Sequence, residues 1–319
     1  MHSAKAPRLI WMSFSKRPVR VRLIGWTLVL LAAMASVAVV ALAGSGGGGG
    51  VGALEAPALI GSPLALIAPI LGGSPKGAVA QYRIIGCRSR GEIDYAHGPS
   101  RHEVAIGFDD GPYQDTPAFV RMLARNHAQA TFFMIGRQVT ATYRSTILDE
   151  LREGDVPGDH TFTHPDMTHT ADPRGQLQST ISAIRAQSGY TPCVFRPPYG
   201  DTDSAVQKVA RSLGLATVTW NVDPSDYLQP GTSTIERRVL SEVQPGSIII
   251  SHDGGGPRGQ TLAAYPAIIA ALRRRGYGIV TIPQLLGFRP VYVRCIRLCD
   301  GIGVSRGALP RDAILERAP

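Results

Sequence analysis

Residues 104–112 read VAIGFDDGP, an apolar run that ends in two adjacent aspartates, a glycine and a proline. Such a run is typical of a buried β-strand, and Gly111 and Pro112 predict a sharp bend at its end. Successive side chains of a strand point to opposite faces, so Asp109 and Asp110 should point in different directions. We therefore assign Asp110 to a metal ion and Asp109 to proton transfer, the division of roles that metal-assisted hydrolysis needs.

From about residue 100, short β-branched or aromatic runs alternate with longer segments of helical composition. This alternation is typical of a parallel βα architecture, and polar residues follow the strands at their carboxyl ends, where α/β barrels build their sites. We expect an α/β barrel, although an open sheet would give a similar pattern. The expected strands are 104–108, 130–135, 193–196, 217–220, 247–251 and 278–281, and the expected helices are 116–125, 174–188, 202–213, 234–241 and 260–275.

Residues 160–164 read HTFTH. On a helix, this spacing would place His160 and His164 on one face, a frequent geometry for metal ligands. Together with Asp110 they form a set of two histidines and one carboxylate, which leaves coordination positions for water and substrate. Asp159 and Asp166 are close enough in sequence to support these ligands. Four other histidines have no comparable partner in sequence, and we expect them to be structural or exposed: His97, His102, His127 and His169.

Residues 195–200 read FRPPYG, in which two prolines stiffen the chain directly after Arg196. We expect Arg196 to pair with Asp109 and keep it ionised, and a backbone N–H near Tyr199 to receive an oxyanion. An ordinary proline-rich turn is the competing interpretation.

Two further segments, 220–227 (WNVDPSDY) and 248–253 (IIISHD), also place polar residues after strands. The pKa of an ordinary histidine lies near neutrality, so His252 could protonate a departing amine, and Asp226 is the carboxylate we expect beside it. Trp220 and Tyr227 are aromatic side chains next to acids, a combination that suits sugar rings.

Taken together, these motifs resemble those of carbohydrate esterase family 4, the polysaccharide deacetylases with a NodB homology domain. The family's first motif, usually Thr-Phe-Asp-Asp-Gly-Pro, is matched from Gly107, which replaces the threonine. The resemblance implies that Asp109 is the catalytic base and Asp110 a metal ligand. The second motif, His-Ser/Thr-x-x-His, implies that His160 and His164 are the other two ligands.

The third motif, Arg-x-Pro-Tyr, matches at Arg196, Pro198 and Tyr199. It implies an arginine that orients the base and a backbone amide that binds the oxyanion. We expect Pro198, Tyr199, Trp220 and Tyr227 to contact the substrate.

The fourth motif, Asp-x-x-Asp-Trp, is matched by Asp223 and Asp226 but ends in Tyr227, and the fifth, Leu-x-His, is matched at His252. The resemblance covers roughly residues 100–288. It implies a distorted (β/α) barrel of the NodB type and a divalent metal, commonly Zn²⁺, with other divalent ions as alternatives.

The whole chain has a net charge of +9. Much of this charge lies in the amino-terminal residues 1–22, which contain six Lys or Arg residues and no acid. They precede the uncharged apolar segment 23–43, which is long enough to cross a membrane. This segment is either a transmembrane anchor or a signal segment, because residues 41–43 (ALA) also suit a cleavage site. In both cases the rest of the chain is exported, either anchored and facing outward or secreted.

The other boundaries follow from composition. Residues 44–99 are a linker and lead-in rich in glycine and proline, residues 100–288 are the catalytic domain, and residues 289–319 are a carboxyl-terminal extension. Cys87, Cys193, Cys295 and Cys299 allow three disulfide pairings in an exported protein. We expect one of the two carboxyl-terminal cysteines to bond Cys87. A four-cysteine zinc site is disfavoured because the chain has no Cys-x-x-Cys pair.

These observations predict a metal-dependent deacetylase that removes N-acetyl or O-acetyl groups from an envelope or extracellular polysaccharide. Peptidoglycan, chitin-like oligomers and acetylated xylan all remain open as substrates. The competing hypothesis is a noncatalytic glycan-binding module on the same fold. Nucleic-acid binding is disfavoured because much of the positive charge lies in residues 1–22.

Overall fold

The computed structural model describes residues 81–89, 94–295, 304–306, 309 and 311–316. The basic segment 1–22, the apolar segment 23–43 and the linker up to residue 80 lie outside the described residues. Within the described part of the chain, we find no helix that is long and apolar enough to span a membrane.

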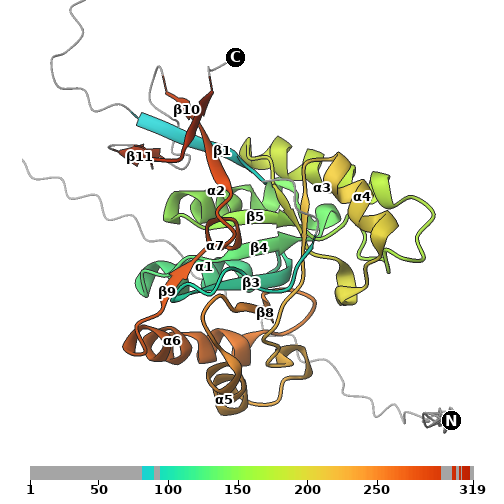
Figure 1. The fold of residues 1–319 in the computed structure, drawn as a ribbon. Coiled ribbons are helices and arrows are strands. Elements are labelled where there is room, and N and C mark those ends of the chain that lie inside the picture. Colours follow the sequence, from blue (N-terminus) through green and yellow to red (C-terminus); the bar gives the residue numbers. More distant parts are fainter. Residues whose placement is uncertain (1–80, 90–93, 296–303, 307–308, 310, 317–319) are drawn as a thin grey trace, which may run out of the picture. The chain divides into compact units, whose positions relative to one another are not determined.

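The main sheet consists of parallel strands in the order β2-β7-β6-β5-β4-β3-β8, and β9 also pairs with β3 (Figure 1). After β7, the chain returns to the other edge of this path, where Val222 forms a parallel bridge with Ile249 of β8. The sheet is therefore curled, as the sequence predicted for a distorted barrel. Its strands are β2 (Asp94–Tyr95), β3 (Glu103–Gly111), β4 (Thr131–Met134), β5 (Val156–Asp159), β6 (Val194–Phe195), β7 (Ala216–Val218), β8 (Ile248–His252) and β9 (Gly278–Val280).

The five predicted helices are present, each with ends within two residues of the prediction. They are α1 (Thr116–Arg125), α3 (Pro173–Ser188), α4 (Ser204–Ser212), α5 (Thr232–Glu242) and α6 (Gly259–Arg274). Two further α-helices among the described residues were not predicted from the sequence, α2 (Arg144–Glu153) and the short α7 (Ile282–Leu285).

The sequence analysis also missed β5, because Pro157 and Gly158 both disfavour a strand. Proline is tolerated here because β5 pairs with β4 along its length but with β6 only at Asp159. A Cβ at position 158 would lie 2.6 Å from the ring of Phe133, so glycine allows β4 and β5 to pack closely.

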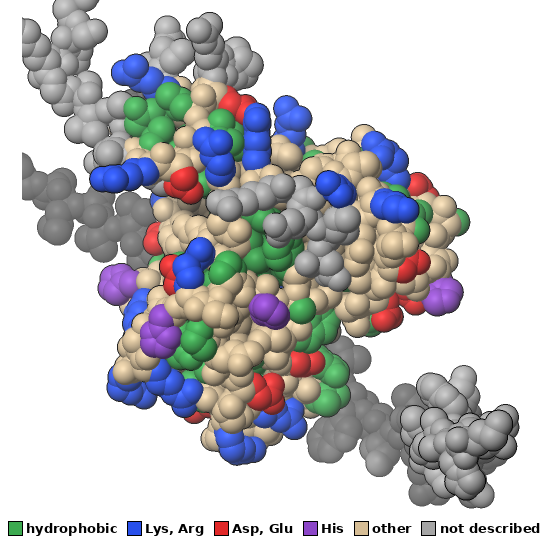
Figure 2. All heavy atoms as spheres, in the orientation of Figure 1, with side chains coloured by type: hydrophobic (Ala, Val, Ile, Leu, Met, Phe, Trp, Pro, Cys, Tyr) green, Lys and Arg blue, Asp and Glu red, His purple; other side chains and the backbone are tan. Residues whose placement is uncertain are grey.

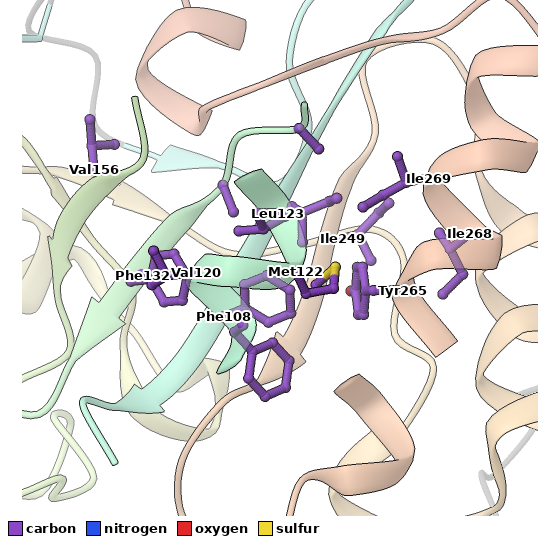
Figure 3. Packing of buried hydrophobic residues seen from close by; sticks show 14 of the residues in the cluster. Phe108, Val120, Met122, Leu123, Phe132, Val156, Ile249, Tyr265, Ile268 and Ile269 are labelled. Carbon is purple, nitrogen blue, oxygen red and sulfur yellow. The ribbon is translucent and has the colours of Figure 1, made fainter. Parts of the chain in front are cut away.

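The side chains of β3 alternate between two environments. Val104, Ile106 and Phe108 point toward the helices, where the ring of Phe108 lies 4.8 Å from the ring of Tyr265 in α6 (Figure 3). Ala105 belongs to a separate apolar cluster, and Gly107 lies against the buried Arg196. The period of two therefore places a packed hydrophobic core on one face of β3, and on the other face a second apolar cluster at Ala105 followed by the buried Arg196 and Asp109.

A second, small sheet has the order β11-β1-β10-β12, and the sequence analysis did not predict it. The strand β1 (Gln81–Arg88) runs antiparallel to β10 (Arg289–Arg294) and to β11 (Val304–Arg306), and β12 (Ile314–Glu316) runs parallel to β10. The small sheet thus joins segments about 200 residues apart in sequence.

The small sheet is attached to the main sheet by a disulfide bond between Cys87 of β1 and Cys193, directly before β6. Our expectation that Cys87 bonds a carboxyl-terminal cysteine is therefore wrong. The physical reason is that Gly86 forms a parallel bridge with Thr191, which brings the two cysteines to a Cα–Cα distance of 5.4 Å.

Candidate active site

A cavity of about 430 Å³ opens at the carboxyl ends of the parallel strands. Its lining combines carboxylates, imidazoles and aromatic rings, and among the described residues no Lys or Arg lines it. The lining residues are Asp109, Asp110, His160, His164, Pro197, Tyr199, Trp220, Asp223, Tyr227, Ile250 and His252.

The three predicted metal ligands meet in this cavity. The Nε2 atoms of His160 and His164 lie 3.5 and 3.3 Å from Oδ1 of Asp110, and the three donor atoms lie within 4.8 Å of one another. Oδ1 of Asp110 is buried and accepts no hydrogen bond from any residue that the structure describes. Two imidazole nitrogens and an unsatisfied carboxylate oxygen fit a divalent cation such as Zn²⁺.

The charge of this carboxylate is stabilised by the two imidazoles. Burial alone would raise the pKa of Asp110, but the proximity of His160 and His164 holds it below its usual value. Nδ1 of His160 lies 2.7 Å from the carbonyl oxygen of Arg196, which can only accept a hydrogen bond. Nδ1 therefore carries a proton, and Nε2 is the ring nitrogen that faces Asp110 and could bind a cation.

The expectation that His160 and His164 share a helical face is wrong. His160 directly follows β5, and the chain then forms an irregular loop in which Thr161 and His164 have positive φ angles of 65° and 64°. Asp159 stabilises this loop by accepting a hydrogen bond from the N–H of Thr161 at 2.8 Å. The loop, rather than a helical turn, brings the two rings to within 5.0 Å of each other.

Asp109 is 2% exposed and forms an ion pair with Arg196, whose Nη1 lies 2.8 Å from Oδ1. Arg196 is fully buried, with its guanidinium 4.1 Å from the ring centre of Phe133 and its Nη2 3.3 Å from the carbonyl oxygen of Thr219. Burial lowers the pKa of Arg196, but the neighbouring carboxylate favours its charged form. This arrangement keeps one oxygen of Asp109 occupied and directs the other toward the cavity.

Gly107, where the chain departs from the first motif of the family, makes room for this arginine. A Cβ at position 107 would lie 2.8 Å from Nη2 of Arg196 and still closer to Nη1. The guanidinium thus occupies the space that a side chain at this position would need.

His252 lies beside Asp109, because the two residues are register partners in β8 and β3. Its Nδ1 lies 2.7 Å from Oδ1 of Asp226, and its backbone N–H donates to Oδ2 of the same carboxylate at 3.0 Å. Thr261 in α6 also donates to Oδ2 at 2.7 Å. Burial alone would lower the pKa of His252, but Asp226 and the neighbouring aspartates raise it above its usual value. Nε2 remains available for proton exchange with a bound molecule.

Aromatic side chains form the rim of the cavity. Tyr199 is 66% exposed and its ring lies 4.9 Å from His164, whereas Tyr227 is 51% exposed and its ring lies 5.6 Å from His252. Trp220 also lines the cavity. The predicted contact residue Pro198 is buried, and its neighbour Pro197 lines the cavity instead.

Asp166 does not support the histidine pair as expected, because its carboxylate bonds Thr168 and His169 instead. His169, which had no evident partner in sequence, therefore has one in the fold, although it is largely exposed. His97 and His102 each contact a backbone carbonyl, of Gly98 and Gly276, outside the cavity.

The sequence analysis missed the role of Asp253 and the glycines after it. Asp253 is fully buried, accepts a hydrogen bond from Thr116 at the start of α1, and donates its backbone N–H to the carbonyl oxygen of Asp109 at 3.1 Å. A Cβ at Gly255 would lie 2.5 Å from Oδ2 of Asp110, and one at Gly254 would overlap the Asp110 backbone. The run of three glycines after His252 was the available signal for this close approach.

The family model of the polysaccharide deacetylases matches residues 96–218 of the chain. A peptidoglycan-N-acetylglucosamine deacetylase of Bacillus cereus is 36% identical over 192 residues, which cover 58% of this chain and 89% of the relative. A chitooligosaccharide deacetylase of Bradyrhizobium is 35% identical over 207 residues, which cover 60% of this chain and 94% of that protein.

Solved structures show the same relationship. The peptidoglycan N-acetylglucosamine deacetylase Bc1960 superimposes with a TM-score of 0.59 at 31% identity, covering 61% of this chain and 94% of that one. A carbohydrate esterase family 4 pseudoenzyme from Bacillus anthracis superimposes with a TM-score of 0.56 at 27% identity, covering 60% and 68%. The chain has a curled parallel sheet and these motifs, and it covers 89% and 94% of the two deacetylases compared by sequence. It belongs to the polysaccharide deacetylase family.

Proposed function

We propose that the protein is an exported, metal-dependent deacetylase of an envelope or extracellular polysaccharide, with N-acetyl groups as the principal substrate and O-acetyl groups as the alternative. The relatives' names support peptidoglycan or chitin-like oligomers as the glycan. One observation carries the proposal: a possible metal site, a buried carboxylate paired with arginine and a histidine paired with aspartate all line one cavity.

Asp110, His160 and His164 are the residues that would hold the cation. A divalent ion bound there supplies Lewis acidity, which polarises an acetyl carbonyl and makes water more acidic. The donor set of two imidazoles and one carboxylate is typical of catalytic zinc.

The proton transfers fall to two residues on neighbouring strands. Asp109 accepts the proton of the attacking water, and Arg196 holds this carboxylate in position. His252 donates a proton to the departing amine, and Asp226 holds its ring in place and favours the charged form. The backbone N–H of Tyr199 is the group that we assign to the developing oxyanion.

The presence of both proton-transfer groups supports an enzyme over a noncatalytic glycan-binding module, because binding alone requires neither of them. The similarity to a pseudoenzyme makes a direct test necessary. The composition of residues 1–43 supports export, with the body either anchored and facing outward or secreted.

The test is acetate release by the full chain from chitin oligomers, peptidoglycan and acetylated xylan. We expect release from at least one N-acetylated glycan, loss of release with a chelator, and recovery when Zn²⁺ is added back. Binding of these glycans without acetate release, with Zn²⁺ present, would establish the noncatalytic module instead.

A further inference from the structure

A groove of about 630 Å³ runs along the small sheet, where this sheet meets the carboxyl end of α3. Apolar and small residues from β1, β10 and the segment before β6 form part of the lining, and three arginines contribute the positive charge. Figure 2 shows arginine side chains gathered over the small sheet, with few acids among them. The lining residues are Arg83, Ile85, Gly86, Cys87, Arg88, Arg185, Gly189, Thr191, Val291, Val293 and Glu316.

Two of the three arginines have no acidic partner within the part of the chain that the structure describes. Arg88 forms an ion pair with Glu316 at 2.6 Å, and Glu316 is the one acid among the lining residues. Among the residues that the structure describes, neither Arg83 nor Arg185 has an ion pair. The guanidinium of Arg83 lies against Gly189, since a Cβ there would be 3.7 Å from Nη1. Both guanidinium groups are therefore available to an external anion.

The carboxyl end of α3 would by itself disfavour an anion, because its last carbonyl groups carry partial negative charge. Here Arg144 donates hydrogen bonds to the carbonyl oxygens of Ala186 and Gln187. A fourth guanidinium thus compensates the helix end beside the groove.

This groove lies at the amino ends of the parallel strands, because Thr191 precedes β6 whereas the catalytic cavity follows it. The strands β1 and β10 to β12 also lie outside residues 96–218, which the family model matches. The groove shares no lining residue with the cavity that contains the candidate catalytic residues, and the two are separate sites.

We propose that the groove binds a strand of an acidic polysaccharide. Guanidinium groups form paired hydrogen bonds with carboxylate or phosphate groups, and the apolar side chains of Ile85, Val291 and Val293 suit the C–H faces of sugar rings. A concave groove fits a polymer strand better than a flat lipid surface. Binding there would hold the enzyme near a polymer and raise the local concentration of acetylated sugars at the opposite end.

The test measures binding of the full chain, solubilised in a non-ionic detergent, to polygalacturonate, with dextran as the neutral polymer. The double variant Arg83→Gln/Arg185→Gln should bind polygalacturonate at least about tenfold more weakly than the unmodified chain. Arg125→Gln/Arg274→Gln removes the same charge from exposed sites on α1 and α6 and should change binding less than twofold. All the proteins share the basic segment 1–22, so its contribution cancels in the comparison.

Equal binding by the unmodified chain and the groove variant would overturn the proposal, as would equal binding to polygalacturonate and dextran. Tighter binding to phosphatidylglycerol vesicles or duplex DNA that depends on the same two arginines would overturn the assignment to a polysaccharide. Acetate release from a short neutral oligosaccharide should be unchanged in the groove variant. Because the binding measurement does not depend on acetate release, its result is independent of the proposed function.

Discussion

The two ends of the parallel sheet differ in charge and in how their side chains are held. At the carboxyl end, the cavity is lined by three aspartates and three histidines, which buried contacts such as the pair of Asp109 and Arg196 hold in place. At the amino end, the groove is lined by arginines, two of them without acidic partners among the described residues. The first arrangement is suited to chemistry at a fixed point, and the second to adaptable contact with a polyanion.

This difference predicts that substitutions at the carboxyl end change catalysis, whereas those at the amino end change stability or binding.

Asp109→Asn should have the largest effect on turnover. It should lower kcat by about 10²- to 10⁴-fold, because the variant lacks the base. Zn²⁺ affinity, measured by competition with a chromogenic chelator, should change little. His164→Ala, which removes a ligand, should lose both activity and affinity. An active Asp109→Asn enzyme would refute the assignment of the base.

A smaller loss of activity is expected when a side chain at position 107 fills the space that the guanidinium of Arg196 occupies. Gly107→Thr should push the guanidinium away from Asp109, a steric conflict that costs roughly 1–3 kcal/mol, and should reduce kcat/KM by about tenfold or more. Gly259→Ala is the matched control, since a Cβ there meets no heavy atom within 4 Å. Full activity of Gly107→Thr would show that Arg196 can orient the base from another position.

Asp226→Asn tests the acid. His252 has a raised pKa, so in the unmodified enzyme it keeps its proton to higher pH than an ordinary histidine. Removing the charge of Asp226 lowers that pKa, and the alkaline limb of the kcat/KM profile should move to lower pH, with a loss of about 10- to 100-fold. Asp223→Asn, which alters a carboxylate bonded to the N–H of Ser225, should leave the limb in place. An unmoved limb in Asp226→Asn would remove His252 from the role of acid.

The smallest effect on turnover is expected at the amino end. Cys87→Ala/Cys193→Ala should lower the free energy of unfolding by about 2–4 kcal/mol, because the bond closes a long loop. Urea denaturation gives this value, and activity at 25 °C should stay within about twofold. Reduction of the unmodified chain should produce the same shift of the denaturation midpoint. A large loss of turnover in a variant that is still folded would show that the two ends are coupled.

The carboxyl end was more predictable from sequence than the amino end, for physical reasons. A strand such as β3 and the two aspartates near its end are encoded within nine residues, so local pattern suffices. By contrast, β1 pairs with β10 across about 200 residues, and no local signal specifies that partner. Spacing alone also cannot choose a disulfide pairing, which here depends on the bridge between Gly86 and Thr191.

Within the site, prediction failed where the backbone is unusual. The spacing of His160 and His164 is compatible with a helix, yet positive φ angles at Thr161 and His164 produce a loop with a similar ring separation. The strand β5 was not predicted because Pro157 disfavours a strand. The fold tolerates this proline because β5 pairs with β6 only at Asp159. The contacts of Asp253 depend on the approach of α1 to β8, which appears only in three dimensions.

The small sheet gathers Gln81, near the start of the described body, and Glu316, near its end, on the side remote from the cavity. A bead, electrode or fused partner coupled close to either residue would therefore leave the mouth of the cavity open. The geometry suits an immobilised catalyst for long or insoluble chains, because the attachment points and the cavity lie at opposite ends of the parallel strands.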